Sequence, residues 1–260
     1  MKLLSRRHWL LLLLVVSFAA LNAVAFFHAW RFTHFANEPG LHSPNPEQLS
    51  PGQKLMLLLT GTSGAFFVLT YGGALVGFVL ALVNTFKKKP SPALVLAYAF
   101  FEGLFVGGIS GFYNTAFDGI VPQAVFGTLG VFAVTLLLFM SGKVRATPKA
   151  TRFFIIAMVG YMAFTLVNLV LMWTGVTQSA FGLMGVTLFG IPLGVLIGIF
   201  VVVMAAYSLI LDFDQIKTGV ERGAPRVYAW TAAFGLIVTL VWLYLEILRI
   251  LAIVASSSRN

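Results

Sequence analysis

The chain has 260 residues, of which 59% are apolar and 10% are charged, whereas soluble domains average roughly 45–50% apolar and about 25% charged residues. A water-soluble fold of this composition could not cover its surface with polar groups, so a soluble protein is excluded. The formal charge of +9 does not indicate nucleic-acid binding, because the basic residues lie in short gaps between apolar blocks and form no cationic face. The absence of cysteine excludes disulfides, thiolate metal sites and a cysteine nucleophile.

The apolar residues form blocks of about twenty, the length that an α-helix needs to cross a hydrocarbon core of about 30 Å. Because lipid offers the backbone no hydrogen-bond partners, each block must be a helix. We therefore predict an all-α integral membrane protein with seven transmembrane helices. The blocks are residues 9–29, 63–86, 93–111, 119–140, 153–174, 179–211 and 229–255, and the spanning part of the sixth starts near Pro192.

The amino-terminal segment is predicted as a transmembrane helix over residues 1–30 and an outer loop with an interfacial approach over 31–62, followed by a six-helix remainder over 63–256. Ala23-Val24-Ala25 has the small-x-small form of a signal-peptidase site. The apolar run continues through Phe27 without a polar break, which favours an uncleaved signal anchor over cleavage. His34 and His42 in the loop form a weak metal signal, because no third ligand is near.

The basic residues of the connections alternate between the two sides. Thirteen fall on the side of the amino terminus, against Arg31, Lys54 and Arg259 on the other. The positive-inside rule then places the amino terminus in the cytoplasm and the carboxy terminus outside.

Ionisable residues inside membrane spans are costly and usually have a function. Glu102 lies at the middle of the third block, and Glu246 lies near the middle of the seventh. We expect both near the bilayer midplane, where they could share one interior site. Arg249 follows Glu246 by three positions and can neutralise it on the same helical face. This trio is either a proton-linked switch or a structural hydrogen bond beside a fixed ion pair.

Asp212 and Asp214 close the sixth block, and Glu221 follows in the same connection. Three carboxylates at an inner mouth would suit a hard cation, although acidic residues at a solvated helix end also cost little. Gly190, Gly194 and Gly198 recur every four residues, which predicts a face for close helix packing. No sequence motif of an enzyme is present, so a transported or sensed ion is the favoured ligand and no cofactor is expected.

From about residue 73 to 252 the chain resembles bacterial members of the Bax inhibitor-1 family, the transmembrane Bax-inhibitor-motif proteins. The segments that carry the resemblance are KKKPSPALVLAYAFFEGLFVGGIS, GIVPQAVFGTLGVFAVTLLLFMSGKVRATPK, LILDFDQIKTGVERGAP and AAFGLIVTLVWLYLEILRILA. Residues before about 63 do not match the family well. The resemblance implies a seven-helix bundle with the last helix central, the bacterial inner membrane, and a pH-sensitive calcium leak.

The resemblance also implies a gate made of two aspartates that share a proton, one late in the sixth helix and one in the seventh. Asp212 matches the first position, and Glu246, in LYLE where many members read LYLD, is the counterpart that the motif indicates. Two departures stand out. Asp212 and Glu246 are 34 positions apart, which would put them at different depths in a simple helical hairpin. The family's second-helix arginine also has no counterpart.

Two functions follow as hypotheses. The first is a pH-sensitive cation leak, with calcium as the permeant ion and Asp212, Glu246, Arg249 and Glu102 as sensor and gate. The alternative is a non-conducting regulator that binds a membrane protease or another membrane protein through its small-residue faces.

Overall fold

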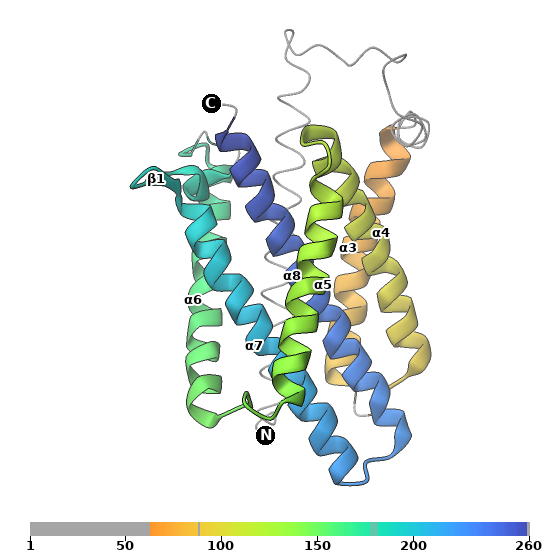
Figure 1. Cartoon of the computed structure of the whole chain (residues 1–260). Coiled ribbons are helices and arrows are strands. Elements are labelled where there is room, and N and C mark those ends of the chain that lie inside the picture. Colours follow the sequence, from red (N-terminus) through yellow and green to blue (C-terminus); the bar gives the residue numbers. More distant parts are fainter. Residues whose placement is uncertain (1–62, 88, 178, 180, 259–260) are drawn as a thin grey trace.

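The computed structural model describes residues 63–87, 89–177, 179 and 181–258, and the side chains from 69 onward. Within this part, six helices are long and apolar enough to cross a membrane. They form a bundle of roughly aligned helices (Figure 1). Their bounds are α3 Ser63–Phe86, α4 Pro92–Ala116, α5 Ile120–Met140, α6 Pro148–Trp173, α7 Leu193–Glu221 and α8 Ala229–Ser257.

Local sequence sets several of the helix ends. Pro92 and Pro148 stand at the first positions of α4 and α6, where the missing N–H costs nothing. The Thr147 side chain caps α6 by accepting a hydrogen bond of 3.2 Å from the Ala150 amide. Gly119, with φ +75°, precedes α5, and Gly223, with φ +62°, follows α7; both backbones lie in the left-handed region that glycine adopts freely.

Helix α8 is the centre of the bundle. Of the residues in its span, 61% are buried, against 22–44% in the other five helices. It packs against α7, α5 and α4, and its buried side chains include Trp242, Leu243 and Leu248. The all-helical membrane fold with a central last helix is therefore confirmed.

Six of the seven predicted blocks correspond to the six observed helices, and the first lies outside the described residues, as do His34 and His42. The sixth block begins with a loop. It contains a 3-10 turn η2 (Gly182–Gly185) and a short hairpin of β1 (Thr187–Leu188) and β2 (Ile191–Pro192) before α7 starts at Leu193. Its spanning part thus begins next to Pro192, as predicted.

The basic connections lie at one end of the bundle. The connections α3–α4, α5–α6 and α7–α8 meet at the lower end in Figure 1, and the described carboxy terminus lies at the upper end. The lower connections carry Lys87, Lys89, Lys143, Arg145, Arg222 and Arg226. The predicted alternation therefore holds for the six described helices, and this end is called the basic end below.

The predicted glycine face is only partly correct. Gly194 and Gly198 lie on α7 and are buried, whereas Gly190 lies in the hairpin turn with φ +81° because the helix has not yet begun. A Cβ at Gly198 would meet Ile250 and approach Oε1 of Glu246 to 3.3 Å. Gly198 therefore lets α7 lie close against α8 inside the bundle.

We expect Gly198→Ala to destabilise the protein by about 1–3 kcal/mol, because a methyl group at this contact overpacks the α7–α8 interface. Thermal unfolding followed by tryptophan fluorescence measures the effect. Gly160→Ala is the matched control, since a Cβ at this α6 glycine meets nothing within 4 Å. An equal loss in both variants would mean that the close approach of α7 and α8 is not what the glycine provides.

Candidate functional site

The buried ionisable groups are distributed along α8 and are not gathered in one place. Tyr98 of α4 contacts Phe234 with ring centroids 5.0 Å apart, and Ser110 of α4 hydrogen-bonds Tyr244 at 2.6 Å. Helices α4 and α8 therefore run parallel, with a nearly constant offset in residue number. This offset places Glu102 near the level of Val238, about two helical turns from Glu246. The hypothesis that Glu102 and Glu246 could share one interior site is therefore not supported by this arrangement.

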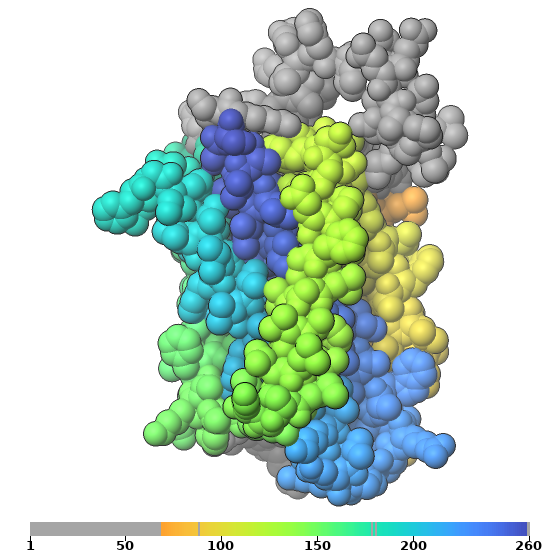
Figure 2. Space-filling model, in the orientation of Figure 1, coloured from red at the N-terminus to blue at the C-terminus, as the bar shows by residue number. Residues whose placement is uncertain are grey.

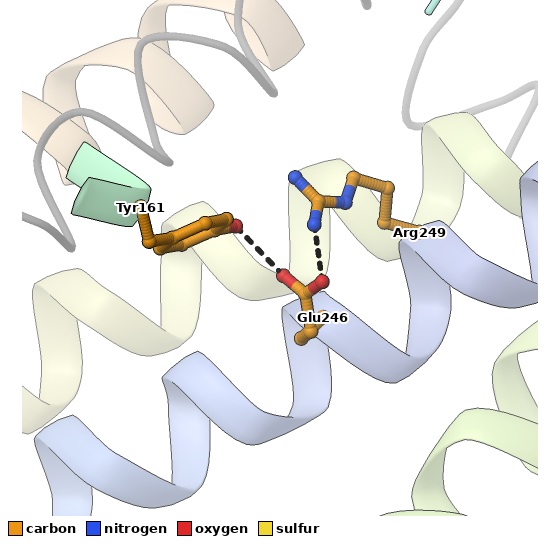
Figure 3. A network of polar contacts seen from close by, with 3 residues as sticks. All are labelled: Tyr161, Glu246 and Arg249. Carbon is orange, nitrogen blue, oxygen red and sulfur yellow. Dashed lines mark hydrogen bonds and ion pairs between the residues drawn. The ribbon is translucent and has the colours of Figure 1, made fainter. Parts of the chain in front are cut away.

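One buried polar group is a triad formed by Tyr161, Glu246 and Arg249 (Figure 3). Arg249 pairs through Nη2 with Oε1 of Glu246, and the Tyr161 hydroxyl of α6 donates a 3.0 Å hydrogen bond to Oε2. Glu246 is 0% exposed and Arg249 is 4% exposed. Both carboxylate oxygens therefore have a donor, and the ion pair is closed off from water.

The surroundings of the triad explain how the pair is tolerated. The guanidinium carbon of Arg249 lies 5.8 Å from the centre of the Tyr161 ring, within the range of a cation–π attraction. Nε and Nη1 of Arg249 have no hydrogen-bond partner among the described residues. Glu246 is therefore the main compensation for this cation, and the two charges depend on each other.

A second polar group lies nearer the basic end, between α7 and α8. Thr239 donates a 2.8 Å hydrogen bond to Oδ2 of Asp212, and its oxygen lies 3.4 Å from the Ser208 hydroxyl. Gly235 provides the space, because a Cβ there would come within 3.1 Å of Oδ1. Asp212 is partly exposed, whereas Ser208 and Thr239 are fully buried. The Asp212 carboxylate thus has one hydroxyl partner, Thr239, and no ion pair within the described residues.

The structure therefore separates Asp212 from Glu246. Thr239 contacts Asp212, and Glu246 lies seven positions further along α8, a rise of roughly 10 Å. The expected difference in depth is present, and the residue opposite Asp212 is a threonine where the resemblance implied a second carboxylate. Neither Thr239 nor Tyr161 was predicted from the sequence.

Glu102 is buried against α3. It is 1% exposed, and a Cβ at Gly77 would come within 2.9 Å of its Oε2. Its Oε1 and the Tyr98 hydroxyl have no hydrogen-bond partner within the described residues. Tyr98, one turn earlier on α4, belongs to an apolar cluster with Ala81 and Val238, so Glu102 is a separate feature from the triad.

The other predicted polar residues do not join these groups. Glu221 is exposed and pairs with Lys217 of its own helix at 3.6 Å, and the partly exposed Asp214 has no ion pair among the described residues. No cluster of three metal-ligating side chains exists in the part of the chain that the structure describes. Asn168 of α6 is a further buried polar residue, and its Oδ1 accepts a 2.7 Å hydrogen bond from the Leu183 amide.

Five spanning helices around a central sixth helix with a buried ion pair define a polytopic α-helical membrane protein. The chain belongs to the Bax inhibitor 1-like family, whose family model matches residues 7–256. The expectation that residues before about 63 fall outside the family pattern is therefore wrong. No curated protein and no solved structure matches the chain.

Proposed function

We propose that this protein is a pH-sensitive cation leak of the Bax inhibitor-1 type, with calcium as the permeant ion. The observation that supports this most is Asp212, a partly exposed carboxyl at the α7–α8 interface that accepts a hydrogen bond from Thr239 and has no ion pair within the described residues. Such a group can exchange a proton with the solution near the basic end, and its charge then depends on pH.

In this proposal the two polar groups have different roles. Arg249 occupies the place beside Glu246 where a passing cation would bind, so the triad keeps the deep part of the bundle closed. Deprotonation of Asp212 adds a negative charge between α7 and α8 and favours cation entry from the basic end. The leak then increases with rising pH.

We further propose the bacterial inner membrane as the location, with the basic end in the cytoplasm. Support comes from the positions of the described lysines and arginines, which fall mainly in the connections of one end as the positive-inside rule requires. From the sequence we also infer that the amino terminus lies in the cytoplasm and the carboxy terminus lies outside.

We expect calcium flux into proteoliposomes to rise between about pH 5 and 8, and Asp212→Asn to remove this dependence because the amide cannot ionise. Glu246→Gln should lower the flux at every pH, because it leaves Arg249 as a buried, unpaired cation in the path. Glu221→Gln is the control: this exposed residue pairs only with Lys217 among the described residues, and its variant should behave as the wild type.

If the folded, reconstituted protein passes no calcium at any pH, the leak is excluded and the non-conducting regulator becomes the better hypothesis. In that alternative, the partner protein binds to a face of small residues. Gly194 and Gly198 are instead buried against Met184, Ile250 and Ile253, so these two glycines are not available to a second protein. A partner would have to bind elsewhere.

A further inference from the structure

The hairpin of β1 and β2 extends sideways from the end of the bundle opposite the basic end (Figures 1 and 2). Thr187 pairs with Pro192 and Leu188 pairs with Ile191, so only Phe189 and Gly190 form the turn. Both have positive φ, 53° and 81°, the backbone pattern of a type I′ turn. The hairpin is thus a regular, tight structure.

Phe189 is an unusual residue for its place. The first position of such a turn favours asparagine, aspartate or glycine, because other side chains are strained at positive φ. Phe189 is the only non-glycine residue with positive φ in the described part of the chain. The residue is 98% exposed, so contacts within the protein do not compensate for the strain. An observed outlier of this kind points to a role outside the folded chain.

The surroundings of Phe189 are apolar as well. Trp173 is 78% exposed and Val176 is 70% exposed, and both lie at the same end of the bundle. The hairpin also exposes Val186, Leu188 and Ile191. No charged side chain occurs between Arg152 and Asp212. If this surface faced water, it would expose an apolar patch to solvent, which is unfavourable.

We propose that residues 186–191 form an interfacial membrane anchor, with Phe189 inserted into the phospholipid leaflet at the end opposite the basic end. Lipid is the expected contact because the hairpin continues a surface that already faces lipid in a spanning bundle. This surface includes the exposed apolar residues Val170 of α6 and Ile199 and Val203 of α7. A two-stranded ribbon has unpaired backbone groups at its edges and cannot enter the hydrocarbon core. The hairpin therefore lies in the headgroup and upper acyl region, where tryptophan side chains such as Trp173 are also favoured.

The proposed anchor is held against α7 by backbone and packing contacts. The Leu193 amide donates a 2.7 Å hydrogen bond to the Val186 carbonyl, and Met184, which is 0% exposed, packs against Gly194. Asn168 holds the same loop to α6 through the Leu183 amide. Insertion of the hairpin would therefore fix the depth at which α7 enters the membrane.

Because the chain contains no cysteine, a spin label can be placed at single sites without background. We expect a label at Phe189→Cys or Leu188→Cys, in the full-length protein in phosphatidylcholine vesicles, to be relaxed more by oxygen than by a water-soluble nickel chelate. Val134→Cys, on the lipid-facing side of α5 at 58% exposure, provides the lipid reference. Asp118→Cys, exposed in the α4–α5 turn at the same end, provides the water reference.

Nickel relaxation at positions 188 and 189 equal to that at Asp118→Cys would place the hairpin in water and overturn the proposal. Low accessibility to both reagents with dipolar broadening would show that a second copy of the chain covers the hairpin, which also overturns it. The measurement is independent of ion conduction, so its result does not depend on the proposed leak.

Discussion

Replacing Arg249 with glutamine should destabilise the protein by about 3–5 kcal/mol, because it leaves the Glu246 carboxylate buried without a cation. Glu246 is 0% exposed and, among the residues that the structure describes, keeps only the Tyr161 hydroxyl as a donor once the guanidinium is gone. Thermal unfolding in detergent, followed by tryptophan fluorescence, measures the change, since Trp242 lies buried on the same helix.

Two further variants make this result specific. Lys217→Gln breaks the exposed pair with Glu221 and should change stability by less than about 1 kcal/mol. The double variant Glu246→Gln, Arg249→Gln removes both buried charges and should recover most of the loss, because two amides can hydrogen-bond each other. If Arg249→Gln is as mild as Lys217→Gln, the ion pair is not the buried structural element described above.

The spacing of the pair on α8 has a consequence for assembly. Glu246 and Arg249 are three positions apart, so they face the same side of one helix and can pair before any other helix packs against α8. A neutralised pair is cheaper to insert into lipid than two separate charges. Tyr161 and Gly198 then complete the site when α6 and α7 join the bundle.

The helices of this fold could be predicted from sequence because lipid imposes a simple rule. Each spanning segment needs about twenty apolar residues and internal backbone hydrogen bonds, and six observed helices follow that pattern. The alternation of basic connections also needs no tertiary information. The pairing of Glu246 with Arg249 followed in the same way from a three-residue spacing on one helix.

The contacts between helices could not be predicted as easily, because they depend on register. The resemblance led to Glu246 as the residue opposite Asp212. Asp212 lies nine positions before the end of α7 at Glu221, and Thr239 lies ten after the start of α8 at Ala229. Counting from these ends would have identified Thr239, but the ends themselves depended on the turn at Gly223 and the short 3-10 helix η3 (Arg226–Tyr228).

The separation of Glu102 from Glu246 has a similar cause. Each lies near the middle of its own apolar block, which suggested a common depth. The offset between α4 and α8, however, is set by contacts such as Tyr98 with Phe234, and hydropathy contains no signal for it. Tyr161 was missed because a tyrosine in an apolar block is equally consistent with ordinary packing.

The contact between Thr239 and Asp212 can be tested by introducing a second carboxyl at position 239. Thr239→Asp would place a second carboxyl beside Asp212, where the threonine oxygen now lies 2.8 Å from Oδ2. Two carboxylates at this distance cannot both ionise without strong repulsion, so the pair retains one proton that the unfolded chain would release. The folded variant then binds more protons than the unfolded one above about pH 4.

The sign of the effect follows from linkage. Where the folded state binds more protons, the free energy of unfolding falls as pH rises. We therefore expect Thr239→Asp to lose stability relative to the wild type on going from about pH 5 to pH 8, by an amount on the order of 2 kcal/mol. Thermal unfolding at a series of pH values measures this loss without any assay of conduction.

Thr239→Asn is the matched control, because it has nearly the same shape as the aspartate and cannot ionise. It should show the same pH dependence as the wild type. In proteoliposomes, Thr239→Asp should also move the midpoint of the calcium leak to higher pH, since the shared proton must leave before the α7–α8 interface gains its full charge. A stability profile for Thr239→Asp that parallels that of Thr239→Asn would show that Asp212 and position 239 do not face each other in the folded protein.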